Sequence, residues 1–252
     1  MGSRDAEASG GKAAVVVIAI DGPAASGKST TALAVAEAIG ASHLDSGAMY
    51  RAVTVLALSL GTLEADALLK EAERRKLTLR IIDQGIVPYL DGKEAEPLLR
   101  SPEVNALVSQ VSALPEVREW VNSEMRAAVE RGLVAMDARS RKPTQAVVLD
   151  GRDIGTAVFP GAPVKVFLTA SPEVRAARRL AQQGRKAHPD EIAREAAVLT
   201  ARDRQDQART VAPLRRAADA EVLDTSRMRF QEQVQAIVEL IRRRLPDLLT
   251  PA

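Results

Sequence analysis

The residues with the clearest chemical potential form one short segment of small and polar side chains, GPAASGKS, which runs from Gly22 to Ser29. Its spacing, G-x-x-x-x-G-K-[ST], is typical of a phosphate-binding loop between a strand and a helix. Small residues let backbone N–H groups converge on phosphate oxygens, and the following helix adds partial positive charge at its N-terminus. The alternative is a tight glycine turn without a ligand, which leaves the Lys28 cation beside a group of donors with no anion.

This loop predicts the binding of a nucleoside triphosphate together with Mg²⁺. Lys28 is expected to reach the β- and γ-phosphates and to act in catalysis. The Ser29 hydroxyl is the expected ligand of Mg²⁺. The residues expected to bind ATP are Gly22, Pro23, Ala24, Ala25, Ser26, Gly27, Lys28, Ser29 and Thr30.

Three segments that contain arginine could hold a second phosphorylated ligand, because the planar guanidinium binds phosphate through two hydrogen bonds. The first is Leu44–Arg51, where Ser46 begins a predicted helix and Arg51 follows about one and a half turns later. The alternative is a helix-capping serine and an arginine that extends along an otherwise apolar helix.

The second segment is Leu149–Pro160, in which Arg152 and Asp153 come directly after a predicted strand. Ligands of open α/β sheets gather at the carboxyl ends of the strands, so this position favours a site. The alternative is an ordinary charged turn in which Arg152 pairs with Asp150 or Asp153.

The third segment is Thr200–Ala217, where Arg202, Asp206 and Arg209 lie at i, i+4 and i+7 on one helical face. Alone, this pattern is typical of a solvated helix with salt bridges. Together with a phosphate loop, it favours a basic helix that closes over the transferring phosphate. We therefore expect Arg152, Arg202 and Arg209 to join Lys28 in catalysis.

Other nucleotide chemistries lack their defining residues. Neither Asn105 nor Asn122 is followed by lysine, and no Asp-x-x-Gly occurs, so the motifs of a GTPase are absent. The predicted strand that ends at Asp150 is followed by Gly-Arg, whereas a helicase or motor would place adjacent acidic residues there. A small kinase that holds two polyanions remains.

Composition limits the partners. The 252 residues contain 35 basic and 33 acidic side chains, a near balance that does not support bulk nucleic-acid binding. The chain has no cysteine, which is compatible with a reducing cytosol. The longest apolar run, Ala52–Leu60, is much shorter than the roughly 20 residues of a membrane span. We expect a cytoplasmic monomer with no nucleic-acid or membrane partner.

The elements that must position these residues alternate as in an α/β fold. We predict a three-layer P-loop fold with a five-stranded parallel sheet. The predicted strands are Val15–Ile20, Ala41–Asp45, Ala146–Asp150, Val164–Thr169 and Glu221–Asp224. The predicted helices are Lys28–Ile39, Ser46–Leu60 and Ala65–Lys76, one that starts after each of the caps Ser101 and Ser171, and a last one over Gln231–Arg244.

Residues 62–100 interrupt this alternation. The runs Leu77–Ile82 and Ile86–Leu90 are separated by Asp-Gln-Gly and followed by Asp-Gly, which predicts a small antiparallel insertion on the acceptor side of the sheet. The expected division is a disordered tail over 1–14, a core with the loop over 15–61, an insertion that binds the acceptor nucleotide over 62–100, and the rest of the core over 101–252 with a helical lid at about 184–212.

Six segments together resemble the bacterial cytidylate (CMP) kinases of the nucleoside monophosphate kinase superfamily. In chain order they are IDGPAASGKST, LDSGAMYR, VSQVSALPEVRE, DGRDIGTAVFP, APVKVFLTAS and RDRQDQARTVAPL, and they span nearly the whole chain after the tail. The loop alone is widespread, whereas its combination with DSGAxYR, GRDIGT and RDxxDxxR is highly specific. One departure is the segment 133–145, which is longer than the resemblance leads us to expect and has no assigned role.

The resemblance implies transfer of the γ-phosphate of ATP to CMP or dCMP. Arg152 would hold the acceptor phosphate with Ser46 and Arg51, and Arg209 would lie near the transferring group. The cytosine edge would meet Ser109, Arg118 and Asp153, because its amine donates while its N3 and O2 atoms accept. The residues expected to bind CMP are Ser46, Tyr50, Arg51, Ser109, Arg118, Arg152, Asp153, Arg202, Asp206 and Arg209. A kinase for UMP, dTMP or AMP is the alternative.

Overall fold

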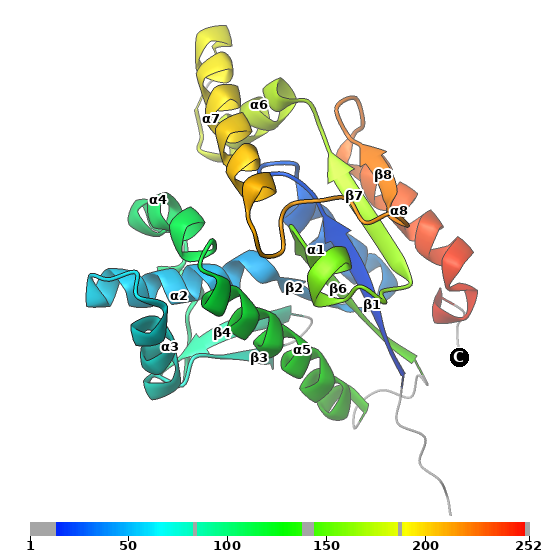
Figure 1. Cartoon of the computed structure of the whole chain (residues 1–252). Helices are drawn as coiled ribbons and strands as arrows, with labels where there is room; N and C mark the ends of the chain where they lie inside the picture. The colour runs from blue at the N-terminus through cyan, green and yellow to red at the C-terminus, as the bar shows by residue number, and fades with distance from the viewer. Residues whose placement is uncertain (1–13, 83–84, 138–143, 186–187, 250–252) are drawn as a thin grey trace, which may run out of the picture.

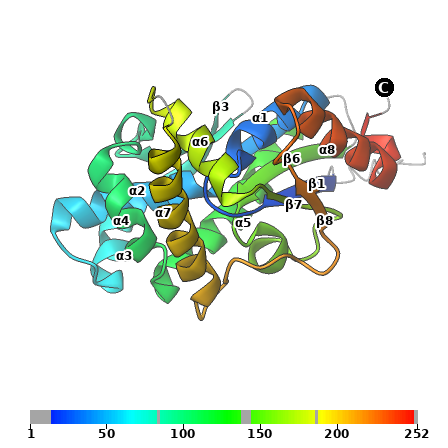
Figure 2. The same cartoon turned by 90° about the horizontal axis from the view of Figure 1, so that it is seen from above.

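The computed structural model describes residues 14–82, 85–137, 144–185 and 188–249. Helices cover both faces of a central sheet, and this three-layer arrangement is visible from two directions (Figures 1 and 2). The expected tail lies outside the described residues except for Ala14, which begins the first strand.

The centre of the sheet consists of five parallel strands in the order β2-β6-β1-β7-β8. They are β1 (Ala14–Asp21), β2 (Ser42–Asp45), β6 (Thr144–Gly151), β7 (Val164–Thr169) and β8 (Glu221–Asp224). These are the five strands predicted from the sequence, and the predicted fold class is confirmed. Parallel strands place their carboxyl ends at one edge, so the segments that follow β1, β2 and β6 meet there.

The two faces of the sheet bury different helices. Along β1, Val17 and Ala19 belong to one apolar core, while Ile18 and Ile20 belong to the other, as expected for side chains that alternate along a strand. One face is covered by α1 (Lys28–Ile39) and α8 (Phe230–Arg244), and the other by α2 (Ser46–Leu60) and α5 (Pro115–Asp137).

The insertion continues the same sheet. Strand β4 (Gly85–Leu90) pairs in parallel with β2, and it pairs antiparallel with β3 (Thr78–Ile82) and β5 (Lys93–Glu94). An antiparallel hairpin thus extends the parallel sheet, as predicted. Helix α3 (Ala65–Arg74) precedes it and ends before Lys76, which has a left-handed φ of 51°. The role of the insertion in binding an acceptor stays a prediction.

Three more helices stand beside the carboxyl edge of the sheet (Figure 1). They are α4 (Pro102–Val111), α6 (Pro172–Gln182) and α7 (Pro189–Ala208). Ser101 and Ser171 cap α4 and α6, since each hydroxyl accepts a hydrogen bond from the backbone N–H three residues later. These two predicted helix starts are confirmed. That α7 belongs to a mobile lid stays a prediction.

Only part of the segment 133–145, which has no assigned role in the sequence, lies between a helix and a strand, because its two ends belong to regular elements. Helix α5 continues to Asp137 and β6 begins at Thr144, and residues 138–143 between them lie outside the described part. No sequence pattern indicated this extension, because helix and strand patterns fade gradually at their ends.

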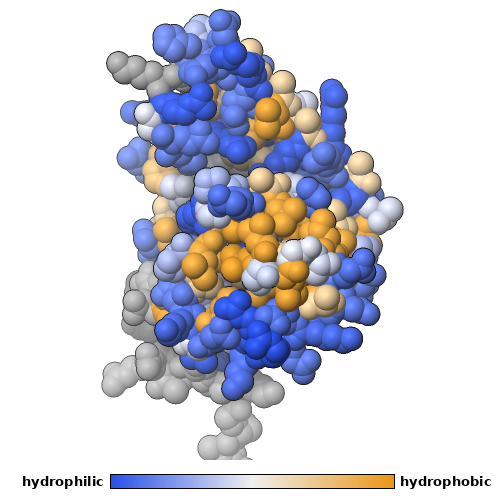
Figure 3. Space-filling model, turned by 90° about the vertical axis from the view of Figure 1, so that its left-hand side faces the viewer, coloured by the Kyte–Doolittle hydropathy of each residue, from blue (hydrophilic) through white to orange (hydrophobic). Residues whose placement is uncertain are grey.

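The side of the molecule formed by α2, α3 and α4 has a broad apolar area (Figure 3). Among the described residues, the exposed large apolar side chains include Leu58 and Leu60 of α2 and Leu98 of the short helix Glu96–Leu98. Among the described helices, none is by itself long and apolar enough to cross a membrane, and the consecutive helices α2 and α3, which would suffice together, are bent by 103°.

The loop after β6 is fixed by a buried carboxylate at the end of β1. Asp21 accepts hydrogen bonds from the backbone N–H groups of Ile154 at 2.8 Å and Gly155 at 2.7 Å. A Cβ atom at Gly155 would lie 3.1 Å from the Lys165 side chain, so the close packing there favours glycine. Because Arg152 and Asp153 immediately precede this turn, Asp21 determines where they lie.

Asp21 generates a test of this arrangement. Burial raises its pKa from 3.8 to about 6, against the effect of its two backbone hydrogen bonds. The stabilisation present below pH 3.8 is therefore lost as the pH rises through 6. We expect the wild-type protein to lose up to about 3 kcal/mol of unfolding free energy through this group between pH 4 and pH 7. Denaturant unfolding at both pH values measures this loss.

The Asp21→Asn variant should lack that loss, since its amide does not titrate. The exposed Asp66 offers a control, and Asp66→Asn should lose as much unfolding free energy between pH 4 and pH 7 as the wild type does. An equal loss of unfolding free energy in the wild type and in Asp21→Asn would contradict a raised pKa at Asp21.

Candidate active site

A cleft of about 390 Å³ lies between the segment after β1 and residues of α2, α4, α5 and α7. In Figure 1, α7 stands on one side of this region, and α2 and α4 stand on the other. Its charged lining consists of eight basic side chains, Lys28, Arg51, Arg100, Arg118, Arg152, Arg179, Arg202 and Arg209, and four acidic ones, Asp45, Asp150, Asp153 and Asp206. The excess of positive charge makes the cleft suited to polyanions.

The segment after β1 has the backbone of an anion-binding loop. Gly27 has a left-handed φ of 90°, and a Cβ atom at Gly22 would lie 2.0 Å from the Leu168 carbonyl oxygen, so these two positions require glycine. Helix α1 begins at Lys28 with no side chain capping its N-terminus. Its first N–H groups therefore remain available to a ligand.

Lys28 is buried in this loop, where its ammonium donates a hydrogen bond to the Pro23 carbonyl oxygen at 3.0 Å. Burial and, to a smaller extent, the charge of Arg152 lower its pKa to about 7, against the opposite effect of nearby aspartates. A bound anion would relieve both penalties, because it restores an opposite charge beside the ammonium.

Carboxylates at the ends of β2 and β6 border the loop. Asp150 accepts a hydrogen bond from the Ser29 hydroxyl at 2.6 Å and forms a 2.8 Å contact with the Nε2 atom of His43. Burial opposes ionisation of Asp150, but the contact with His43 and the charge of Lys28 hold its pKa below the ordinary value. The alternative in which Arg152 pairs with Asp150 is therefore wrong, because this carboxylate bonds to Ser29 and His43 while Arg152 pairs with Asp206.

Helix α2 is capped by Asp45, whose carboxylate accepts a hydrogen bond from the Gly47 N–H at 2.8 Å. Ser46 is the first helical residue, so the alternative that it is the cap is wrong. A Cβ atom added at Gly151 would lie 2.6 Å from the Ser46 hydroxyl, so Ser46 lies beside the loop that contains Arg152. Ser46 and Arg51 both line the cleft, as predicted.

A second group of polar atoms is buried deeper in the cleft. Arg118 is 1% exposed, forms an ion pair with Asp153 at 2.6 Å, and lies over the ring of Tyr50 at 5.2 Å. Burial raises the pKa of Tyr50, so its hydroxyl stays protonated. The Arg118 Nη2 and Asp153 Oδ2 atoms face each other in this ion pair, whereas the Arg118 Nε atom and the Tyr50 hydroxyl are buried and make no hydrogen bond within the described part of the chain. They are therefore available to a ligand with donors and acceptors.

Helix α7 and the residue that follows it contribute the third group. Asp206 is buried between two arginines, with Arg152 at 3.1 Å and Arg209 in close contact. Arg209 also donates a hydrogen bond to the Ser112 hydroxyl at 3.0 Å. Burial and, to a smaller extent, the charge of Arg152 lower the pKa of Arg202 to about 10. These side chains face the cleft, so the alternative of a solvated helix with salt bridges is wrong.

The structure brings most of the expected residues to one place. The expected residues that line the cleft are Ala24, Ala25, Ser26, Gly27, Lys28, Ser29, Thr30, Ser46, Tyr50, Arg51, Arg118, Arg152, Asp153, Arg202, Asp206 and Arg209. The expected residues outside this lining are Gly22, Pro23 and Ser109. Their individual roles, including that of Ser109 at a cytosine, stay predictions.

Sequence reasoning missed His43, Asp45, Asp150 and Ser112 as site residues. The two aspartates end predicted strands, and that position was a usable signal, because parallel strands deliver such residues to one edge. His43 and Ser112 had no such signal, since their partners lie far away in the chain.

A phosphate loop that faces a cluster of arginines across one cleft defines a kinase of the P-loop class. The family model of cytidylate kinase matches residues 18–243. The cytidylate kinase of Shouchella clausii is 42% identical over 89% of this chain and 95% of its own length, and that of Carboxydothermus hydrogenoformans is 40% identical over 90% and 97%. The chain belongs to the cytidylate kinase family, which confirms the resemblance found in the sequence.

A crystal structure from Thermus thermophilus is also similar, with 18% identity and a TM-score of 0.44 over 92% of this chain and 98% of that one.

The position of Arg152 predicts a selective defect. Arg152→Ala should raise the KM for CMP about tenfold or more, since a hydrogen bond to a charged group contributes roughly 1.5–3 kcal/mol. The Kd for ATP, measured by calorimetry, should change less, because the loop supplies its own donors. Arg204→Ala changes an exposed arginine of the same helix α7 that carries Arg202 and serves as the control. Equal losses of ATP and CMP binding would contradict this role of Arg152.

Proposed function

We propose that this protein transfers the γ-phosphate of ATP to CMP or dCMP, with ADP and CDP or dCDP as products. The observation that carries the proposal is the buried ion pair of Arg118 and Asp153, which lines the same cleft as the phosphate loop. Cytosine offers an amine donor beside the N3 and O2 acceptors. A carboxylate beside a guanidinium is complementary to that edge.

The same pair argues against other acceptors. Uracil and thymine present a carbonyl oxygen where cytosine has its amine, and this oxygen would repel Asp153. AMP also has an amine, but adenine has no carbonyl oxygen beside its ring nitrogen, so it offers Arg118 one acceptor fewer than cytosine does. UMP, dTMP and AMP therefore remain weaker alternatives.

The reaction that we propose is an in-line displacement. An oxygen of the CMP phosphate attacks the γ-phosphorus of ATP, a new P–O bond forms, and the bond to the β–γ bridging oxygen breaks to release ADP. No general base is needed, because the second pKa of a phosphate monoester is about 6. Lys28 and the arginines stabilise the charge that develops, and closure of the cleft would keep water from attacking ATP.

The arginines of the cleft have different proposed roles, because they lie on different elements of the fold. Arg152 follows β6 and lies on the fixed sheet, where Ser46 and Arg51 face the same cleft. Arg202 and Arg209 belong to α7 and its end, so movement of this helix would bring them to the transferring phosphate. We propose that Arg152 binds the acceptor phosphate and that the two arginines of α7 neutralise the γ-phosphate.

The residues around the loop fit Mg²⁺ as a cofactor. The hydroxyl of Ser29 and the carboxylate of Asp150 are oxygen donors of the kind this ion prefers, and they lie 2.6 Å apart. No group of three or more His, Cys, Asp or Glu that could hold a metal occurs in the described part of the chain. Phosphates and water would then complete the coordination, and the bound ion would neutralise phosphate charge.

The location of the protein, its partners and the segments that enclose the ligands are also proposals. We propose a cytoplasmic monomer with no nucleic-acid or membrane partner, since its charge is nearly balanced. We further propose that residues 62–100 enclose the acceptor and that residues 184–212 act as a lid over ATP.

A coupled assay of ADP release tests the function. With ATP as the donor, CMP and dCMP should give kcat/KM values about tenfold or more above those of UMP, AMP and dTMP, because a mismatched polar group is left unpaired. A preference for AMP or dTMP would contradict the proposal.

The Asp153→Asn variant tests in the same assay whether Asp153 recognises the base. An asparagine amide can donate to a uracil carbonyl, so the ratio of kcat/KM for UMP to that for CMP should rise about tenfold or more. An unchanged ratio would show that Asp153 does not read the base.

A further inference from the structure

Both polar groups of Ala24 in the phosphate loop are held by side chains from two distant helices. Its N–H donates to the Asp203 Oδ1 atom at 2.9 Å, and its carbonyl oxygen accepts from the Arg175 Nη1 atom at 2.9 Å. The same Arg175 nitrogen lies 2.6 Å from Asp203 Oδ2, which closes a ring of three buried partners. Arg175 belongs to α6 and Asp203 to α7.

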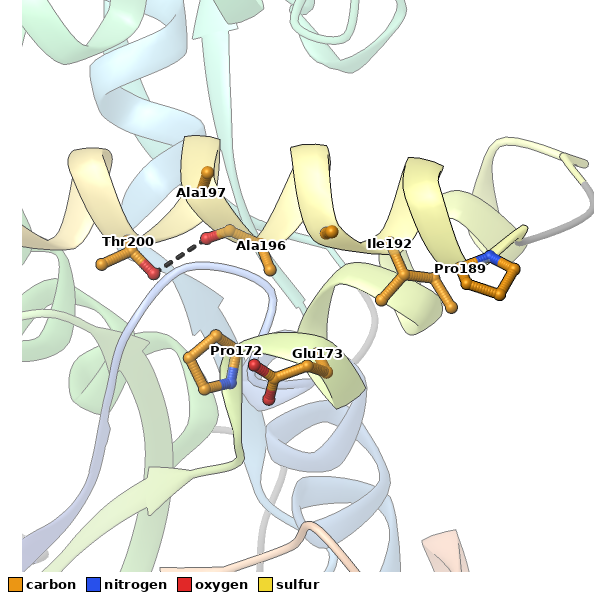
Figure 4. A pocket seen from close by; sticks show the side chains of 8 residues that line it. Pro172, Glu173, Pro189, Ile192, Ala196, Ala197 and Thr200 are labelled. Carbon is orange, nitrogen blue, oxygen red and sulfur yellow. Dashed lines mark hydrogen bonds between the residues drawn. The ribbon is translucent and has the colours of Figure 1, made fainter.

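The surroundings of this ring are apolar. Ala24 packs in one small core with Ala176 of α6 and with Ala196 and Leu199 of α7. Figure 4 shows the two helices side by side, with an open groove between them that is lined mainly by apolar side chains of both. Hydrogen bonds in such a setting are strengthened, because water does not compete for them.

The ring is placed where the loop most needs support. Ala25, the next residue, has a left-handed φ of 57°, which is unfavourable for alanine and has to be imposed by its surroundings. Because the Ala24 N–H is occupied by Asp203, it is not a phosphate donor. The ring therefore shapes the loop from behind and leaves the later N–H groups free for ATP.

The ring also connects the loop to the arginines of the cleft. Asp203 is adjacent to Arg202 and lies one turn before Asp206 on α7, and both of those residues line the cleft. A displacement of α7 at this turn would pull on Ala24, and a distorted loop would in turn shift α7.

We propose that Arg175 and Asp203 are positioning residues for the donor phosphates. They hold Ala24 so that the loop keeps its phosphate-binding shape, and they tie this shape to the placement of α7. The inference rests on the proposed function only in that ATP is taken as the donor.

The rival explanation is that the pair simply fastens α6 to α7. The chain offers a matched control, because Arg179 of α6 and Glu195 of α7 form a second ion pair at 3.1 Å. This control pair joins the same two helices, and neither of its members bonds to Ala24. Since Arg179 lines the cleft and Glu195 does not, the control substitution is made at Glu195. If fastening alone mattered, Glu195→Gln would weaken ATP binding as much as a change in the ring.

Two variants and the control separate these explanations. Asp203→Asn removes the charge, and the double variant Arg175→Met with Asp203→Leu removes both charges, so no unpaired ion remains to prevent folding. Calorimetry with a non-hydrolysable ATP analogue and Mg²⁺ measures the Kd, and thermal melting reports whether each variant is folded. Calorimetry with CMP alone gives the reference for the acceptor side.

The proposal predicts that both ring variants raise the Kd for the ATP analogue about tenfold or more. The Kd for CMP should rise less than that for the analogue, and Glu195→Gln should bind the analogue as the wild type does. A folded double variant with a wild-type Kd for the analogue would overturn the proposal, and so would equal weakening by Glu195→Gln. Failure of the wild type to phosphorylate CMP would refute the proposed function alone, because the analogue binds without an acceptor.

Discussion

The structure depends on the cost of placing several like charges in one partly buried cleft. Lys28 and Arg202 have lowered pKa values, because burial penalises their charged forms and Arg152 adds repulsion. Nearby carboxylates offset part of this cost, as Asp206 does between its two arginines. Only an additional polyanion would balance the excess, so the cleft is unfavourable alone and becomes favourable when phosphates bind. This is the electrostatic condition for phosphoryl transfer.

The parallel sheet brings these charges together. Strand β1 leads into the phosphate loop, β2 leads into Asp45 and Ser46, and β6 leads into the loop of Arg152, all at the same edge. Strands are rigid and are buried on both faces, so their ends are fixed to within a narrow range. The arginines of α7 differ, since this helix packs mainly against α6. We propose that α7 can respond to the ligand, whereas the phosphate loop and the loop of Arg152 are fixed by the sheet.

The central strands and the phosphate loop were predictable because their signals are local. Apolar runs and the G-x-x-x-x-G-K-S spacing depend on neighbouring residues, and the predicted strands and the loop between β1 and α1 are confirmed. The partners of buried charges were not predictable, since Asp150 could pair with any basic residue near the edge, and only the folded chain selects His43. The cap of α2 was misplaced for a similar reason, because Asp45 and Ser46 are both good capping residues and backbone geometry decides between them.

The central claim is that one cleft holds both nucleotides end to end, with phosphate meeting phosphate between Lys28 and the arginines. A dinucleotide that joins adenosine to cytidine through five phosphates tests this directly, because it can occupy both sites at once. Calorimetry should show one molecule bound per chain, with a Kd about a hundredfold or more below that of ATP, and competition against both ATP and CMP. Competition against only one nucleotide, or an affinity no better than that of ATP, would contradict the account.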